Sequence, residues 1–201
     1  MGNSGQREEA REAILDATDR LFERYGYRKT TVEDIAQESA VCRGTVYLYF
    51  KNKEEIALSW LGRYNARVRE RMREIAAEPA PATERIRKML LARILTRLDN
   101  IQHLSVSLDE LFSTMRPLIL EHRQKCQENE AELLASVLNE GKAKGVFHFD
   151  DALTTARLLT LATASLLPYS LSVRQLGERA ELETRANGLV ELLLDGVKTR
   201  L

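Results

Sequence analysis

The residues best suited to chemistry lie together in one short stretch, positions 41 to 53. This stretch holds three cations, Arg43, Lys51 and Lys53, and no acid, whereas the segments on either side of it are rich in Glu and Asp. Lysine and arginine bind the phosphates of nucleic acids and release the counterions condensed on them. A local positive strip therefore predicts contact with a phosphate backbone at this place in the chain.

The first residues of this stretch suit base edges as well as phosphates. Arg43 can donate two hydrogen bonds to O6 and N7 of guanine in the major groove. Gly44 has no side chain, so the backbone can approach DNA closely. The hydroxyl and methyl groups of Thr45 suit a phosphate or a thymine methyl.

Tyr47 and Tyr49 are hard to explain as core on so short a helix, because Val46 and Phe50 already fill its inward face. We expect their phenols to hydrogen-bond phosphates or base edges. Thr31, at the start of an earlier helix, can present its hydroxyl and backbone N–H to a phosphate. The residues expected to contact DNA are therefore Thr31, Arg43, Gly44, Thr45, Tyr47, Tyr49, Lys51 and Lys53.

Several of these residues also have a structural interpretation. Tyr49 would then be a rim residue that covers the first helix, and Lys51 a solvated surface cation. Arg43 would pair with Glu33 or Glu38.

The elements that must position these residues follow from local signals. Apolar residues recur at helical spacing from Glu8 to Tyr25, and Gly26 stands where a C-terminal glycine cap belongs. Thr31 is a good N-cap for a second short helix, with Asp34 three residues later in the position of a shortened capping box. Thr30 with Glu33 offers the same pattern one residue earlier, which leaves two possible starts for this helix. A three-residue turn at 40–42 then leads into a third helix over 43–50.

A fourth helix is expected from Lys53, capped by Asn52 and followed by a proline-rich break at 78–82. Helix, short turn and helix is the arrangement that places a second helix in the major groove of DNA.

The sequence of this region resembles the N-terminal signature of the TetR family of transcriptional regulators. The matching residues are Gly44-Thr45-Val46-Tyr47-Leu48-Tyr49-Phe50 and Lys51-Asn52-Lys53-Glu54-Glu55, with Phe22, Gly26 and Tyr27 before them. Two positions depart from the family pattern. Ala40 replaces a turn glycine, where a left-handed backbone would cost alanine about 1 kcal/mol and favour another local conformation. Cys42 replaces a frequent serine cap; it is a substituted cap residue or an oxidation sensor.

The rest of the chain also shows helical spacing of apolar residues, so we predict an all-α protein of about nine helices. We expect a helix-turn-helix domain at 1–53 and a helical ligand-binding and dimerisation domain at 54–201. In the second domain we predict one helix from about Leu104 to Met115 and another that starts with Pro117. Asp150 is expected to cap a penultimate helix to about Val173, before a last helix over Glu178–Arg200.

The last two helices carry more apolar residues than one protomer needs. A helix that is apolar on nearly all sides requires partners on more than one side, and the family resemblance implies a four-helix bundle between two protomers. A purely internal core is the alternative. The interface candidates are Leu159, Ala162, Leu166, Leu182, Leu189 and Leu193.

The resemblance also implies a pocket for a small-molecule effector among the middle helices, although aromatic and methionine side chains at helical spacing also occur in ordinary cores. The pocket candidates are Trp60, Tyr64, Met89, Phe112, Met115 and His122. His103, Asp109, Glu110 and His122 match no recognised metal-site spacing. We therefore expect neither a metal nor a cofactor.

Composition restricts the remaining possibilities. The 30 Lys and Arg balance the 30 Asp and Glu, which argues against a non-specific nucleic-acid binder with a broad basic surface. Two distant cysteines and the absence of a signal peptide or membrane-length apolar run predict a cytoplasmic protein. No catalytic motif is recognisable, so we expect no enzyme.

The predicted function is a homodimeric, ligand-responsive repressor of a palindromic DNA operator. A regulator without an effector and a helical adaptor that has lost DNA binding are the alternatives.

Overall fold

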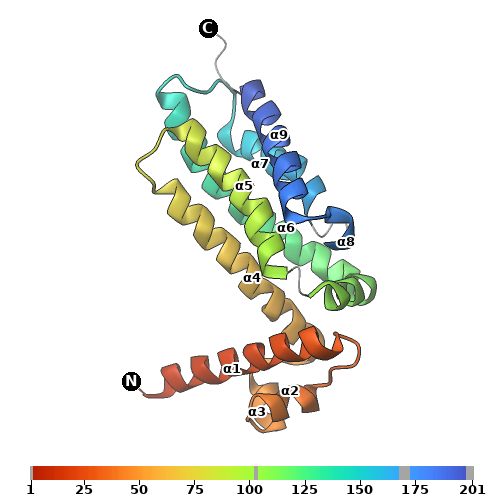
Figure 1. Ribbon diagram of the computed structural model, residues 1–201. Helices are drawn as coiled ribbons and strands as arrows, with labels where there is room; N and C mark the ends of the chain where they lie inside the picture. The colour runs from red at the N-terminus through yellow and green to blue at the C-terminus, as the bar shows by residue number, and fades with distance from the viewer. Residues whose placement is uncertain (1, 102–103, 168–172, 198–201) are drawn as a thin grey trace. The chain divides into compact units, whose positions relative to one another are not determined.

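The structure is a computed structural model that describes residues 2–101, 104–167 and 173–197. It divides into two compact units: Met1–Arg63 with His103–Leu120, and Tyr64–Gln102 with Glu121–Leu201. Both units are built from α-helices (Figure 1), so the predicted all-α class is confirmed. None of the described helices combines the length and apolarity needed to cross a lipid bilayer. The functional division at residue 53 stays a prediction.

The first unit is organised around α1 (Gly2–Tyr25), which packs on α2 (Val32–Glu38) and α3 (Arg43–Tyr49). Gly26 has a φ of 83° and its N–H donates to the Phe22 carbonyl at 3.1 Å, as a left-handed glycine cap should. The ring of Phe22 meets Tyr27 and Trp60 edge to face, with centroids 5.6 and 5.1 Å away. This aromatic cluster fixes the end of α1, from which the chain turns into α2.

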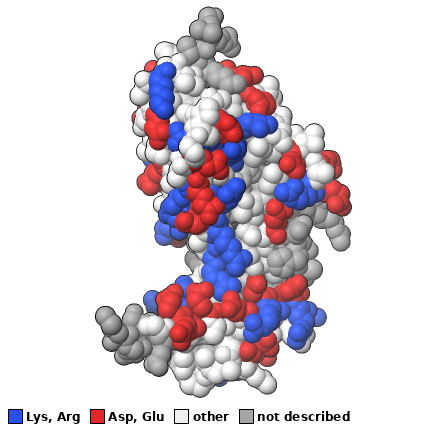
Figure 2. Space-filling view, turned by 60° about the vertical axis from the view of Figure 1, so that its left-hand side comes forward, with Lys and Arg blue, Asp and Glu red and all other residues white. Residues whose placement is uncertain are grey.

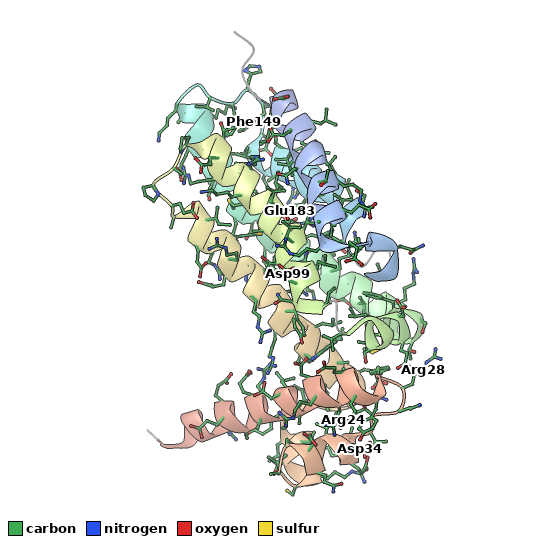
Figure 3. The ribbon with its side chains drawn as sticks, viewed as in Figure 1. Arg24, Arg28, Asp34, Asp99, Phe149 and Glu183 are labelled. Carbon is green, nitrogen blue, oxygen red and sulfur yellow. The ribbon has the colours of Figure 1, made fainter. Side chains whose placement is uncertain are left out.

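The second unit contains α5 (Ala82–Ile101) and α9 (Arg179–Val197), which lie side by side in Figure 1. Arg179 on α9 joins the two helices by donating to Asp99 on α5 at 2.8 Å, and it also donates to Glu183 on its own helix at 2.9 Å; both acids are labelled in Figure 3. The main core of this unit is formed by apolar side chains from five helices. They include Met72, Met89, Leu90, Leu134, Leu138, Leu159 and Leu194.

Two long helices contribute residues to both units: α4 (Lys53–Ala76) and α6 (Ser105–Ala143). Within α6 the backbone of Met115 is not helical, with φ −119° and ψ 22°. Pro117 explains this break, because proline has no N–H and its ring clashes with the carbonyl four residues earlier. The two helices predicted here are thus two segments that meet at an irregular residue.

The end of the chain differs from the prediction. The penultimate helix α7 spans Ala152–Thr163, and Asp151 rather than Asp150 caps it by accepting from the Thr154 N–H at 2.6 Å. A short 3-10 turn, η2 (Ala164–Leu166), follows, and Leu167 is extended with ψ 151°. The predicted extension to Val173 is therefore wrong. The cause is Pro168, since a residue before proline avoids the helical conformation.

After residues 168–172, which lie outside the described residues, comes α8 (Val173–Leu176) and then α9. The predicted end of the last helix at Arg200 also falls outside them.

The expected interface residues are distributed differently from the prediction. Leu159 and Leu182 are 3% and 0% exposed, so they belong to the protomer's own core and are unavailable to a partner. Ala162, Leu166, Leu189 and Leu193 are half-buried. The apolar side chains that α7 and α9 expose are instead Leu158, Leu161 and Leu192, at 61%, 66% and 75%.

Candidate nucleic-acid interface

Thr31 opens α2 with a capping box. Its hydroxyl accepts from the Asp34 N–H at 3.1 Å, and the Asp34 carboxylate accepts from the Thr31 N–H at 2.8 Å. These hydrogen bonds from Thr31 lower the pKa of Asp34, which Figure 3 labels. The predicted cap is confirmed. The reciprocal bonds satisfy backbone groups that an uncapped helix would leave open.

The turn between α2 and α3 keeps its left-handed residue although that residue is alanine. Ala40 has a φ of 56°, and the Val41 N–H donates to the Ala36 carbonyl at 3.1 Å. The chain therefore tolerates a strain of about 1 kcal/mol here, and the turn does not adopt the alternative conformation expected from the substitution. The packing of α2 and α3 fixes the direction of the third helix.

Helix α3 buries one face and exposes the other. Val46 and Phe50 are 0% and 3% exposed, as predicted, whereas Tyr47 is 43% exposed. Leu48 is 82% exposed and was not among the predicted contact residues. Its signal in the sequence was its register, because it lies off the face that Val46 and Phe50 define. An exposed leucine on such a helix suits apolar contact with a thymine methyl.

Arg43 forms the predicted alternative pair with Glu33, at 2.6 Å, and not with Glu38, which binds Arg20 at 2.7 Å. The guanidinium also donates to the Tyr47 hydroxyl at 3.4 Å and lies 5.5 Å from that ring. These partners raise the pKa of Arg43, Tyr47 first and Glu33 second. The Arg43 side chain stays 60% exposed, and exposed ion pairs are weak. A phosphate or guanine can therefore replace Glu33.

The space around Gly44 is open. A Cβ added there would meet only the Cys42 sulfur, at 3.9 Å. Packing within the described protein therefore does not require glycine at this position, which is consistent with a close approach from outside. Cys42 is exposed, and its sulfur lies 3.0 Å from the Thr45 hydroxyl, a contact that lowers the pKa of the thiol.

Lys53 has a structural partnership that the sequence did not reveal. Its ammonium donates to the carbonyls of Tyr27 and Thr30, both at 2.9 Å, and lies 4.2 Å from the centre of the Tyr27 ring. Burial lowers the pKa of Lys53, and burial followed by Glu54 raises that of Tyr27 to about 12. Lys53 thus holds the loop before α2. Lys51 is exposed and Tyr49 half-buried, as their alternative interpretations expect.

The same loop is held from α6. The backbone N–H of Arg28 donates to the Glu110 carboxylate at 2.8 Å, and its guanidinium donates to Ser113 at 3.0 Å. Arg28 is labelled in Figure 3. The Ser107 hydroxyl donates to the Phe22 carbonyl at 2.6 Å. These bonds anchor the end of α1 and the start of the helix-turn-helix.

The predicted pocket residues belong to different units. Trp60, Phe112 and Met115 lie in the first unit, and Tyr64, Met89 and His122 in the second. The Trp60 indole N–H donates to Asp19 at 2.7 Å, which is the role of a core tryptophan. His122 contacts Asn65 at 3.3 Å and Cys126 at 3.6 Å. Of the four residues considered as metal ligands from the sequence, Glu110 accepts a hydrogen bond from the Arg28 N–H, and His103 lies outside the described residues.

Comparisons with known proteins agree with this geometry. A profile of the family described as "Bacterial regulatory proteins, tetR family" matches residues 14–59, the span of the helix-turn-helix. The chain is a member of the TetR family. It is a TetR-family transcriptional regulator, with the N-terminal helix-turn-helix and helical C-terminal part of that family.

The chain is 28% identical over 190 residues to the "Fatty acid metabolism regulator protein" of Bacillus subtilis, covering 93% of this chain and 95% of that protein. It is 29% identical over 150 residues to the "HTH-type transcriptional repressor KstR2" of Mycobacterium tuberculosis, 73% of this chain and 74% of that one. A solved structure of the Bacillus subtilis regulator FadR, in complex with stearoyl-CoA, has a TM-score of 0.66 and 25% identity. That alignment covers 92% of this chain and 98% of FadR. These relatives are named as regulators or repressors and not as enzymes.

This TetR-family protein has as many Lys and Arg as Asp and Glu, 30 of each. On the face that Figure 2 shows, Lys and Arg are interspersed with Asp and Glu, and no broad basic side forms there. DNA contact therefore depends on a small number of positioned side chains, which is the arrangement expected of sequence-specific recognition.

Proposed function

We propose that this TetR-family regulator is a homodimeric repressor that a small molecule releases from a palindromic operator. The observation that supports it most directly is the outward face of α3, where Arg43, Tyr47 and Leu48 are exposed while Val46 and Phe50 hold the helix in place. Residues 1–53 would then act as the DNA-binding part and 54–201 as the effector and dimerisation part. A bacterial regulator of this kind works in the cytoplasm.

The proposed contacts fall into two groups. Arg43, Tyr47 and Leu48 read base edges, and Gly44 admits the backbone to the groove. The hydroxyls and backbone N–H groups of Thr31 and Thr45, the phenol of Tyr49 and the ammonium of Lys51 bind phosphates. Lys53, whose ammonium already has two carbonyl partners, contributes to phosphate binding with its remaining donor.

The experiment that tests DNA recognition is selection of bound duplexes from random DNA by the purified protein, followed by measurement of affinity against salt. We expect one enriched palindrome with half-sites about 34–36 Å apart, because two recognition helices related by a twofold axis enter successive major grooves. Enrichment of no sequence, or equal affinity for all duplexes, would refute the proposal.

We propose that the dimer forms through the exposed leucines of α7 and α9. Leu158 and Leu161 of α7 and Leu192 of α9 are more than half exposed, and Leu189, about one helical turn before Leu192, is half-buried. Helices α7 and α9 contact each other within the protomer, and a large exposed apolar surface is typical of an interaction site.

Substitution Leu161→Glu should place a charge in that interface and produce a monomer in sedimentation equilibrium. The monomer should lose most of its operator affinity, because the two half-sites are no longer bound together. Leu48→Glu, on α3, is the matched control: it should remain a dimer. A dimeric Leu161→Glu protein would place the interface elsewhere.

We propose a fatty-acyl compound as the effector, because the relative that matches over almost the whole chain is named as a fatty acid metabolism regulator and FadR was solved with stearoyl-CoA. The continuous helix α4 carries Lys53 at one end and Asn65 further along. A ligand that moves α4 would therefore disturb the anchored loop before α2.

For release, the ligand must bind the released conformation more tightly than the operator-bound one. A hundredfold ratio between these two affinities gives about 2.7 kcal/mol of coupling free energy. Titration of decanoyl-CoA into the protein–operator complex should weaken DNA binding. An unchanged operator affinity would mean that this regulator does not respond to a fatty-acyl effector.

A further inference from the structure

A groove lies between α4 and α6 within the second unit, and we call it the α4–α6 groove. Its volume is about 380 Å³, within the range of about 300–1,000 Å³ that is typical of small-molecule sites. All of the residues that line it belong to this unit: Arg69 and Arg73 from α4, and Asn129, Glu132, Leu133 and Ser136 from α6. Leu133 is the one apolar side chain in this lining, so the groove suits a polar ligand.

Arg69 brings an unsatisfied donor to this groove. Its side chain is half-buried, and its Nε is shielded from solvent without a hydrogen-bond partner among the described residues. Its guanidinium forms no ion pair within the described part of the chain either. A buried donor without an acceptor is costly, because it has given up its water. A ligand that supplies an acceptor at this place would therefore be bound favourably.

Arg73 adds a second cation one helical turn further along α4. Residues four positions apart are neighbours on a helix surface, so Arg69 and Arg73 lie on the same side of α4. Arg73 donates to Glu70 at 2.8 Å, but the two side chains are 48% and 62% exposed, and an exposed pair is weak enough to exchange its acceptor. A guanidinium fork binds phosphate oxygens through parallel hydrogen bonds. The α4 side of the groove is therefore suited to a phosphate group.

The α6 side of the groove carries groups of a different kind. Asn129 and Glu132 are both exposed there. A carboxylate repels a phosphate but accepts hydrogen bonds from hydroxyl groups, and an acidic side chain has this role toward ribose in nucleotide sites. The amide of Asn129 can both donate and accept. A ligand that fits both sides therefore carries a phosphate at one end and hydroxyl groups at the other.

A groove in the first unit has the opposite character. It measures about 590 Å³, and its charged lining residues are Lys29, Asp34 and Glu38. Two carboxylates thus accompany a single ammonium group, and no guanidinium fork lines this groove. A phosphate is therefore disfavoured there, whereas the α4–α6 groove offers two arginines against one acid.

We propose that the α4–α6 groove binds a phosphorylated nucleoside. The phosphate accepts hydrogen bonds from Arg69 and Arg73 and gives the buried Nε of Arg69 the acceptor that it lacks. Glu132 and Asn129 bind the hydroxyl groups of the sugar. The phosphorylated nucleoside is either a free nucleotide or the nucleotide part of a coenzyme A thioester. The role of this site in regulation rests on the proposed ligand-responsive function, whereas the binding itself does not.

The test measures the binding of adenosine 3′,5′-bisphosphate, adenosine and inorganic phosphate to the purified protein by isothermal titration calorimetry. We expect the bisphosphate to bind at least about tenfold more tightly than adenosine, because it adds charge-assisted hydrogen bonds to the two arginines. It should also bind more tightly than inorganic phosphate, which has no sugar for Glu132. Equal affinities of the bisphosphate and either of the other two probes would overturn the inference.

Substitution Arg69→Met should lower the affinity for the bisphosphate at least about tenfold. The variant should melt no lower than the wild type, because Arg69 has no partner in the fold to lose; a lower melting temperature would count against a ligand-binding role. Arg71→Met is the matched control on the same helix, since Arg71 lies outside the groove and pairs with Glu74 at 2.8 Å. It should bind the bisphosphate as the wild type does. An unchanged affinity in Arg69→Met, or equal losses in the two variants, would overturn the inference.

A second variant decides if Arg69→Met does not fold. Arg73 is exposed, so Arg73→Met should keep the fold, which circular dichroism and operator binding check. Its affinity for the bisphosphate should fall several-fold, and an unchanged affinity would again overturn the inference.

Competition identifies the source of the phosphorylated nucleoside. If the bisphosphate and decanoyl-CoA exclude one another, the groove holds the nucleotide part of the acyl effector, and if both bind together, it takes a separate nucleotide. No binding of the bisphosphate overturns the inference but leaves the proposed function standing, since operator release by decanoyl-CoA is measured separately. If the protein selects no operator at all, the proposed function is wrong whatever the calorimetry shows.

Discussion

Two arginine–glutamate arrangements in this protein use the same chemical groups in opposite settings. On the first unit, Arg43 and Glu33 meet at 2.6 Å while their side chains stay 60% and 54% exposed. In the second unit, Arg93, Arg97 and Glu130 form bonds of similar length with almost no exposure. The distances hardly differ, so the surroundings decide what each arrangement contributes.

The exposed pair is weak because water and salt screen it, and a partner can exchange with it at little cost. The buried cluster has lost its hydration, and removing one member leaves an uncompensated charge in the core. The first arrangement is therefore suited to being replaced by DNA. The second is a fixed part of the fold.

The largest effect is expected when the buried carboxylate is removed. Glu130→Gln should lower the free energy of unfolding by about 3–5 kcal/mol, because two guanidinium groups would then lie buried without their counterion. Urea denaturation followed by circular dichroism measures this. Glu140→Gln, which removes the half-exposed partner of Arg85, is the matched control and should cost less. Equal losses in the two variants would contradict the comparison.

Acid should affect the two arrangements differently. The folded protein lowers the pKa of Glu130 below its ordinary value of 4.5, so the unfolded chain binds more protons in this range and stability rises with pH. The contribution of Glu130 is complete above that ordinary value and is lost as the pH falls through the lowered one. Thermal melts should show wild type losing more stability than Glu130→Gln between about pH 5 and 3. Parallel losses would disprove the assignment.

On the exposed side, Arg43→Ala should weaken operator binding by about 1–3 kcal/mol and reduce discrimination between sequences. The fold should hardly change, because an exposed ion pair contributes little stability. Fluorescence anisotropy with the selected operator measures the affinity. Arg20→Ala, which removes another exposed arginine–glutamate pair of this unit, should leave DNA binding unchanged.

The smallest effect is expected from the partner of Arg43. Glu33→Gln removes the carboxylate that competes with DNA for the guanidinium, so operator binding should tighten by about 0.2–1 kcal/mol, and more at low salt. Glu38→Gln, whose carboxylate binds Arg20, controls for the general loss of a negative charge. Weaker binding by Glu33→Gln would mean that the pair positions Arg43 for DNA instead of competing with it.

Local signals carried most of what the sequence could predict. The capping box of Thr31 and Asp34, the cap at Asn52 and the glycine at position 26 each depend on residues within four positions, and all three are confirmed. The same locality limited the prediction at α7. Asp150 and Asp151 are equally good caps by type, and only the register of the helix separates them.

Features that depend on distant residues could not be predicted. Leu159 and Leu158 are chemically identical neighbours on a helix that is apolar all round, so nothing local says which one faces the core. The partnership of Lys53 with the loop before α2 spans 23 and 26 positions, and that of Arg93 with Glu130 spans 37. In sequence such residues resemble ordinary surface charges, and only folding shows that they are buried together.

The interspersed charges of Figure 2 have a consequence for how this regulator searches a chromosome. Affinity for arbitrary DNA comes almost entirely from the number of phosphates neutralised. Two of the three donors of the Lys53 ammonium already bind carbonyls within the protein. Residence on unrelated sequences should therefore be brief. The regulator would find its target by many short collisions rather than by long one-dimensional sliding, and its occupancy would respond quickly when the intracellular ligand level changes.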